Sequence, residues 1–305
     1  MKPRIVSLIA SSTEIVCALG FEDSLVGISH ECDFPPSICS LPVCTEPRID
    51  VSGSSGDVDR RVKEALADGL SVYRIHTELL RELQPDIILT QMQCEVCAVS
   101  LQDVDAALAD WLGTDPQVVA LSPNSLEDIF QDIATVAQAL GADRGNQLVR
   151  DLNARVEAVS TLVESVEGRP SVACLEWIDP LMAAGNWVPE LVELAGGRNL
   201  FGTAKAHSPW MSWPDLVSED PDIVIALPCG YGLNKTRAEM STLTKRSEWE
   251  SLRAVRSGGV FVVDGNQFFN RPGPRIVDSL EILGEILHPD AFPPRHASSG
   301  WERFA

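Results

Sequence analysis

Basic charge is scarce in this sequence. Lys and Arg number 24 against 44 Asp and Glu, so the formal net charge is −20. No stripe rich in Lys or Arg interrupts the acidic balance, and such a chain would repel a phosphate backbone or an anionic membrane. We therefore expect no nucleic-acid partner. An acidic surface is also a common way for a protein to stay in solution.

Long apolar runs are absent as well. Residues 5–10 are mostly apolar, but Ser11, Ser12, Thr13 and Glu14 follow at once. A secretory signal needs roughly 7–15 apolar residues before a small-residue cleavage site, and a membrane-spanning helix needs about 20. Neither pattern is present, so we expect a cytoplasmic protein without membrane insertion.

The cysteines do not suggest a disulfide framework. They are eight in a chain of 305 residues, and a chain of this length rarely depends on disulfides for a core. Free thiols fit a reducing compartment. Cys17 in a helical pattern and Cys174 in a strand pattern are typical small core residues.

Short apolar strands alternate with amphipathic helices along most of the sequence. This rhythm predicts parallel sheets covered by helices. It is interrupted once, where apolar residues recur at helical spacing across one or two long helices. We expect an N-terminal α/β lobe over residues 1–124, a connecting backbone helix region over 125–166, a C-terminal α/β lobe over 167–290 and a tail over 291–305.

The two halves echo each other in a short motif. Residues 83–89 and residues 218–225 each read as a helix end, a Pro-Asp turn and a buried strand. The repetition favours two lobes of similar, Rossmann-like construction.

Several segments resemble a known family. The opening R-I-V-S-L-x-x-S-x-T-E-I-x-x-x-L-G, which begins at Arg4, resembles the periplasmic iron-chelate and cobalamin-binding family with a helical backbone. Residues 90–100, 184–191 and 264–274 are similar to its cobalamin-binding branch. The resemblance implies two α/β lobes bridged by a long helix, one ligand in the cleft between them and little hinge motion. Family members serve ABC transporters, and the missing export signal puts that coupling in doubt here.

The ligand of an open parallel sheet lies beyond the carboxyl ends of its strands. The candidate ligand-binding residues are therefore those that follow the predicted strands: Ser11, Ser12, Glu31, Gln91, Gln93, Glu176, Trp177, Asp179, Asn186, Trp187, His207, Trp210, Tyr231, Asn266, Phe269 and Arg271. Among them, Trp177, Trp187 and Trp210 offer flat apolar walls with an indole N–H, which suit a large ring such as a corrin.

A possible thiolate site follows the third strand of the first lobe. Cys94 and Cys97 stand at CxxC spacing, and His30 and Cys32 follow the neighbouring strand, so the four could hold zinc or another soft metal if the loops converge. The two thiols of the CxxC could instead form a redox pair, or all these thiols could be inert.

Catalytic residues are not indicated. Glu176 and Asp179 could act as acid and base, but no Ser-His-Asp order, P-loop or Gly-rich dinucleotide motif accompanies them. We expect a protein that binds cobalamin or a related corrinoid or metal chelate and does no chemistry. The alternatives are a metal-thiolate enzyme or metal-handling protein on the same scaffold, with Cys94, Cys97, His30 and Cys32 at its site, and a cytoplasmic partner of another protein.

Overall fold

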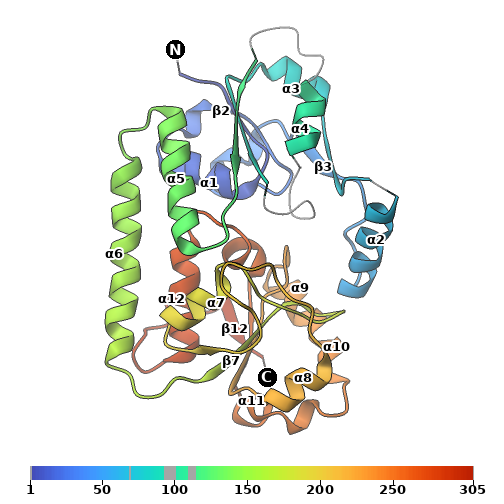
Figure 1. The fold of residues 1–305 in the computed structure, drawn as a ribbon, viewed down its shortest axis with the longest axis vertical. Coiled ribbons are helices and arrows are strands. Elements are labelled where there is room, and N and C mark those ends of the chain that lie inside the picture. Colours follow the sequence, from blue (N-terminus) through green and yellow to red (C-terminus); the bar gives the residue numbers. More distant parts are fainter. Residues whose placement is uncertain (1, 69, 93–100, 109–114, 305) are drawn as a thin grey trace. The chain divides into compact units, whose positions relative to one another are not determined.

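The computed structural model describes residues 2–68, 70–92, 101–108 and 115–304. By their contacts the residues form two compact units (Figure 1). The N-terminal unit contains Met1–Gly53, Asp57–Pro123 and Glu127–Arg150. The C-terminal unit contains Ser54–Gly56, Asn124–Leu126 and Asp151–Ala305.

A parallel sheet forms the centre of the N-terminal unit. Its strands, in the order β2-β1-β5-β6, are β2 (Leu25–Ile28), β1 (Ile5–Ser7), β5 (Ile87–Gln91) and β6 (Gln117–Leu121). The helices of this part of the chain are α1 (Ala10–Ala18), α2 (Ser55–Ala67), α3 (Thr77–Leu83), α4 (Leu101–Leu108) and α5 (Leu126–Leu140). Val6 and Ile88 of the sheet pack with Leu80 of α3 and Val104 of α4, so the alternating apolar residues of the strands face the apolar stripes of these helices.

A small antiparallel pair lies in the same unit. Residues 32–47 are rich in Pro and Cys, and the end of this segment forms β3 (Thr45–Pro47), which pairs with β4 (Tyr73–Ile75). Three-residue strands carry too little periodicity to stand out in a segment rich in Pro and Cys.

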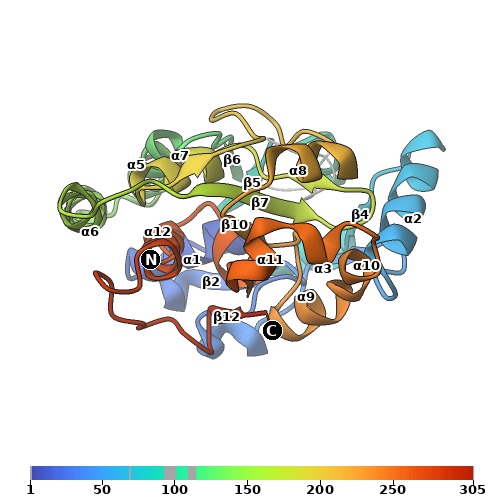
Figure 2. The same cartoon turned by 90° about the horizontal axis from the view of Figure 1, so that it is seen from below.

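The sheet of the C-terminal unit is mixed, with a parallel centre. Strands β11 (Val260–Val263), β10 (Ile223–Ala226) and β7 (Ser171–Trp177) are parallel neighbours, and Figure 2 shows β7 and β10 side by side. The remaining strands are β8 (Met182–Ala183) and β9 (Arg198–Asn199), which both pair with β7, and β12 (Trp301–Arg303), which pairs with β11. The helices are α7 (Val188–Leu194), α8 (Trp213–Glu219), α9 (Leu233–Glu239), α10 (Ser241–Thr244), α11 (Arg253–Ser257) and α12 (Ile276–Leu287), with the short π-helix η4 (Gly265–Phe269).

Alternate residues of β7 face different helices. Ala173 and Leu175 belong to a core cluster with Leu216 of α8 and Leu243 of α10. On the other side, Val172 comes so close to α7 and α12 that a Cβ on Gly197 would contact Val172, Val192 and Leu287 at 2.9–3.0 Å. The predicted fold class, α/β with parallel sheets and long helices, is confirmed.

The expected backbone helix region consists of α5 and α6 (Gly145–Glu164). Helix α5 ends before Gly141, whose positive φ of 62° favours glycine. Gly145 lies against α5 so closely that a Cβ there would be 2.3 Å from Cβ of Ala137. The border between the two units falls inside α6, after Arg150. The helix thus continues from one unit into the other.

The motif repeated in the two halves has the same local geometry. Gln84 and Asp220 end their helices in the left-handed conformation, both with φ of 42°. In the N-terminal unit Asp86 accepts a hydrogen bond from the backbone N of Arg4 at 2.7 Å. In the C-terminal unit Asp222 accepts one from the backbone N of Ser171 at 2.8 Å. Each carboxylate therefore joins the start of its own strand to the start of the neighbouring strand.

The last residues depart from the prediction of a tail. β12 pairs antiparallel with β11, and Glu285 of α12 accepts hydrogen bonds from the backbone N of His296 and from Nε1 of Trp301. The segment is rich in Pro, Ser and Gly, which hid a three-residue strand whose stability comes from its tertiary partners. Among the described residues, no helix is long and apolar enough to span a membrane.

Candidate ligand-binding site

Residues from three neighbouring strands meet at the carboxyl edge of the C-terminal sheet. The loop after β10 is tied to the end of β7, because the backbone N of Cys229 donates to the carbonyl of Glu176 at 3.1 Å. The segment after β11 is tied to the same loop, because the backbone N of Asn266 donates to the carbonyl of Tyr231 at 3.2 Å. Three of the predicted site residues, Glu176, Tyr231 and Asn266, are brought together in this way.

An aromatic pair occupies this edge. The rings of Trp177 and Tyr231 have their centroids 5.3 Å apart and are tilted by 57°, a geometry typical of favourable aromatic contacts. The ammonium of Lys235, on α9, lies 3.7 Å from the centre of the Tyr231 ring. Burial lowers the pKa of Lys235, although Glu239 opposes the shift. Trp177 keeps part of its surface exposed, whereas Tyr231 is buried.

Acidic side chains accompany the pair. Ser208, which is buried, donates its hydroxyl to Oε2 of Glu176 at 3.0 Å and accepts from the backbone N of Gly185 at 3.1 Å. Asp179 is exposed, and its carbonyl accepts from Nε1 of Trp177 at 3.1 Å. The edge therefore offers apolar ring surface, with Lys235 and Glu239 as charged groups beside Tyr231.

The other predicted ring walls lie in different surroundings. Trp187 is buried and donates its indole N–H to the carbonyl of Phe269 at 2.9 Å, and Phe269 has no exposed surface. These two rings pack within the unit. Trp210 is 56% exposed, so it is the predicted ring most open to a ligand.

The remaining candidates of this unit are spread along its loops. Asn186 adopts a left-handed φ of 52° and is held by backbone hydrogen bonds with Lys205 and Ala206. His207 is exposed, with Nδ1 3.0 Å from the carbonyl of Ser208. Arg271 is buried, at 4% exposure.

A chain of hydroxyls marks the end of β1 in the N-terminal unit. Ser7 and Ser12 have their Oγ atoms 2.6 Å apart, and Thr13 donates to Ser7 at 2.7 Å. Ser11 and Ser12 are both buried. Ser12 therefore stabilises the turn from β1 into α1, whereas the Oγ of Ser11 has no hydrogen-bond partner in the described part of the chain.

The proposed thiolate set is not assembled by the residues that can be placed. Nδ1 of His30 lies 2.7 Å from Oγ1 of Thr45, and Sγ of Cys32 lies 3.1 Å from Oγ1 of Thr13, so the two side chains have different partners. Burial lowers the pKa of His30. Cys94, Cys97 and Gln93 lie outside the described residues.

The remaining candidates of the N-terminal unit are Glu31 and Gln91. Oε1 of Glu31 accepts from the hydroxyl of Tyr73 at 3.5 Å. Gln91, the last residue of β5, is buried.

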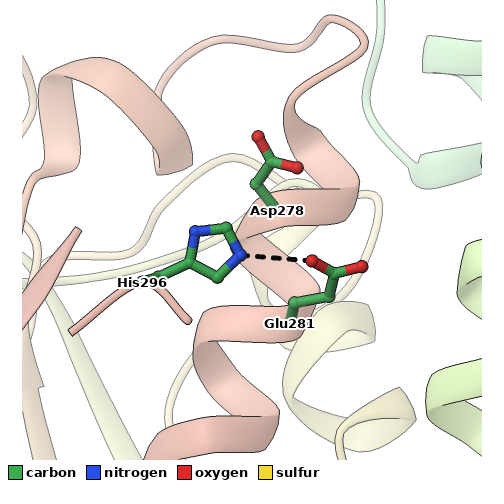
Figure 3. Close-up of side chains that lie close together, drawn as sticks. All are labelled: Asp278, Glu281 and His296. Carbon is green, nitrogen blue, oxygen red and sulfur yellow. Dashed lines mark hydrogen bonds and ion pairs between the residues drawn. The ribbon is translucent and has the colours of Figure 1, made fainter. Parts of the chain in front are cut away.

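A group with metal-ligand chemistry occurs instead beside α12. The ligating atoms of Asp278, Glu281 and His296 lie within 4.8 Å of one another, and Figure 3 shows Nε2 of His296 joined to Glu281. However, the guanidinium of Arg155 lies 2.5 Å from Asp278 and 2.8 Å from Glu281. The guanidinium of Arg155 thus already pairs with both carboxylates, so this group is an ion-pair cluster.

A family model described as periplasmic binding protein matches residues 5–266. The chain belongs to this family. The match covers every strand of the two sheets except β12, and it includes the Trp177–Tyr231 edge. It confirms the family resemblance inferred from the motifs.

Curated members of the periplasmic binding protein family match most of the chain. The vitamin B12-binding protein of Vibrio cholerae is 22% identical over 301 residues, covering 93% of this chain and 88% of the relative. The uncharacterized ABC transporter substrate-binding lipoprotein YvrC of Bacillus subtilis is 22% identical over 300 residues, covering 95% and 81%. The cobalamin-binding protein of Halobacterium salinarum is 22% identical over 291 residues, covering 93% and 69%.

Solved structures share the fold. The periplasmic heme-binding protein RhuT from Roseiflexus sp. RS-1 superposes with a TM-score of 0.71 at 23% identity, covering 95% of this chain and all of that one (100%). The vitamin B12-binding protein BtuF of Vibrio cholerae gives 0.66 at 20% identity, covering 95% and 97%. At these identities the likeness concerns the fold.

Sequence reasoning missed several residues of the edge in this family member. Lys235 and Glu239 lie on α9, whose mixed polar sequence has no clear apolar stripe, and Ser208 lies in a loop. The charged residues that follow the predicted strand at 223–227 were the feature of the sequence that could have identified Lys235 and Glu239 as candidates. No signal in the sequence pointed to Ser208, because its role depends on Glu176, 32 positions away.

Proposed function

We propose that this chain is a binding protein that captures cobalamin or a related corrinoid or metal chelate. The observation that carries the proposal is the Trp177–Tyr231 pair at the carboxyl edge of the C-terminal sheet, 5.3 Å between ring centres. Edges of this kind are where ligands of α/β sheets bind. The protein would contribute recognition and no bond-making chemistry.

The chemistry of the edge supports a ring-shaped ligand. Aromatic side chains present flat apolar surface, and the partly exposed face of Trp177 could lie against a macrocycle. Relatives named for vitamin B12 and neighbours named for heme point to ligands of the same shape, a metal held in a planar ring.

The direct test is a titration of the purified chain with cobalamin. Binding is followed by tryptophan fluorescence and, independently, by the corrin absorbance retained in equilibrium dialysis. We expect saturation at one equivalent. Trp177→Ala should weaken binding about tenfold or more, because it removes an aromatic contact of the hot-spot type. Trp301→Phe, on β12, is the matched control and should bind as the unchanged chain does.

The contrary result is equally clear. A chain that shows no corrinoid response but carries one equivalent of tightly bound metal, lost in a Cys94→Ala, Cys97→Ala variant, would overturn the proposal. It would favour the metal-thiolate alternative, for which the described residues offer no assembled site.

We also propose that the chain works in a reducing compartment. Six cysteines lie in the part of the chain that the structure describes, and all six are free thiols, which fits the cytoplasm. Coupling to a membrane transporter would then be absent, in contrast to the relative named as an ABC transporter substrate-binding lipoprotein. Fractionation of the producing cells, with detection of the native protein, tests the location.

A further inference from the structure

The hydroxyl of Tyr231 is buried without satisfying its hydrogen-bonding capacity. The residue is 3% exposed, and within the described part of the chain its Oη has no hydrogen-bond partner. A buried polar group without a partner costs free energy, so native proteins keep few of them. Such a group at a binding edge invites a functional explanation.

The position of the Tyr231 ring is set by its backbone and its neighbours. The carbonyl of Tyr231 accepts from the backbone N of Asn266 at 3.2 Å and from Oγ1 of Thr236 at 3.5 Å. Its ring contacts the ring of Trp177 and also the ammonium of Lys235. The hydroxyl is therefore held in place before any ligand arrives, and this pre-organisation reduces the entropy cost of binding.

We infer that Tyr231 is a specificity-determining residue, whose hydroxyl donates a hydrogen bond to an uncharged carbonyl oxygen on the bound ring ligand. An amide side chain on the rim of a corrinoid supplies such an oxygen. This inference rests on the proposed function and adds the chemical class of the ligand's rim.

Charge around the ring favours an uncharged acceptor over a carboxylate. The carboxylate of Glu239 lies close enough to Tyr231 to raise its pKa, and the ammonium of Lys235 lies over the same ring. A carboxylate on the ligand would be repelled by Glu239 and would lose its hydration beside a buried phenol, whereas an uncharged carbonyl oxygen avoids both costs. Burial and the nearby Glu239 also raise the pKa of Tyr231, which keeps the phenol protonated as a donor.

The test compares two corrinoids that differ at the rim. Cobinamide carries amides on its ring, and cobyrinic acid carries carboxylates on the same ring. Their affinities are measured by equilibrium dialysis for the unchanged chain, for Tyr231→Phe and for the control Trp213→Phe, which removes a donor from α8. Urea unfolding of each ligand-free protein is measured in parallel.

We expect the unchanged chain to prefer cobinamide. Tyr231→Phe should lower the affinity for cobinamide by about three- to tenfold, the loss of one hydrogen bond to a neutral acceptor, and should narrow the preference over cobyrinic acid. Its unfolding midpoint should equal or exceed that of the unchanged chain, because no hydrogen bond is lost in the free protein. Trp213→Phe should bind both corrinoids as the unchanged chain does.

Two results would overturn the inference while leaving the proposed function in place. One is Tyr231→Phe binding cobinamide as tightly as the unchanged chain. The other is a lower unfolding midpoint for Tyr231→Phe, which would show that the hydroxyl has a partner in the free protein. Failure of the unchanged chain to bind either corrinoid would overturn the proposed function and this inference together.

Discussion

Asp222, just before β10, joins the start of that strand to the start of β7, and the ligand edge lies at the other end of both strands. Asp222 accepts hydrogen bonds from both the backbone N and the hydroxyl of Ser171, at 2.8 and 2.7 Å, and pairs with Arg253 at 2.8 Å. The hydroxyl of Ser171, with help from its backbone N and from Arg253, holds the pKa of Asp222 down to about 2. Asp222 thus fixes the start of β10 against the start of β7. The carboxyl ends of the same two strands form the ligand edge, at the opposite end of the sheet.

We predict that Asp222→Asn lowers the free energy of unfolding at neutral pH by about 1–2 kcal/mol, a value reduced for the partial exposure of this carboxylate. The folded-state pKa is below the unfolded one, so this stability is present above about pH 4. It is lost as the pH falls toward about 2, the folded-state pKa of Asp222. Urea unfolding across this range should show the two proteins converging. A constant difference at every pH would contradict the assignment.

At the scale of elements, the ion-pair cluster joins three segments of the C-terminal unit. Arg155 of α6 pairs with Asp278 and Glu281 of α12, and His296 adds the chain that leads to β12. Burial acts to raise the pKa of Glu281, but hydrogen bonds from His296 and Arg155 outweigh it and lower the pKa to about 2. The hydrogen bond to Glu281 in turn raises the pKa of His296.

The raised pKa of His296 determines how its contribution to the free energy of unfolding changes with pH. Its stabilising effect is complete below the unfolded-state pKa of about 6.5 and is lost as the pH rises through the folded-state value. We predict that His296→Gln costs about 0.5–1 kcal/mol at pH 5.5 and much less at pH 9. Thermal unfolding at both pH values measures this, with the exposed His207→Gln as the control. A cost that grows with pH would refute the pairing.

For the whole molecule, the thiols divide into protected and accessible groups. Burial raises the pKa of Cys17, Cys44 and Cys174 to about 12 in each case. Cys39 is an exposed free thiol. A thiolate is the reactive form, so these three thiols should be inert at neutral pH.

We predict that brief alkylation of the native protein at pH 7.5 labels Cys39 and leaves Cys17, Cys44 and Cys174 unlabelled. Peptide mass spectrometry identifies the labelled sites. Denaturation before alkylation should expose all eight cysteines of the sequence, and Cys39→Ser should remove its label from the native pattern. Rapid native labelling of Cys174 would show that β7 is less protected than its burial implies.

Much of the fold could be predicted from local patterns. The apolar runs at residues 117–121 and 260–263 are strands in the structure, and the helical patterns at 77–83 and 188–194 are helices. Apolar periodicity and Pro or Gly boundaries are local signals, and they specify such elements without knowledge of the rest of the chain. The short β3 and β12 were missed, since pairing with a distant strand stabilises them.

The sequence by itself determined the α/β class, the family and the set of strand-end residues, because apolar periodicity and the order of motifs are local properties of the sequence. Only the tertiary structure decided which of those residues meet. Trp177 and Tyr231 come together because β7 and β10 are parallel neighbours. Trp187 and Phe269 are instead buried inside the C-terminal unit, where the indole of Trp187 donates to the carbonyl of Phe269. Sheet order and burial arise from contacts between residues tens of positions apart, and no local pattern encodes them.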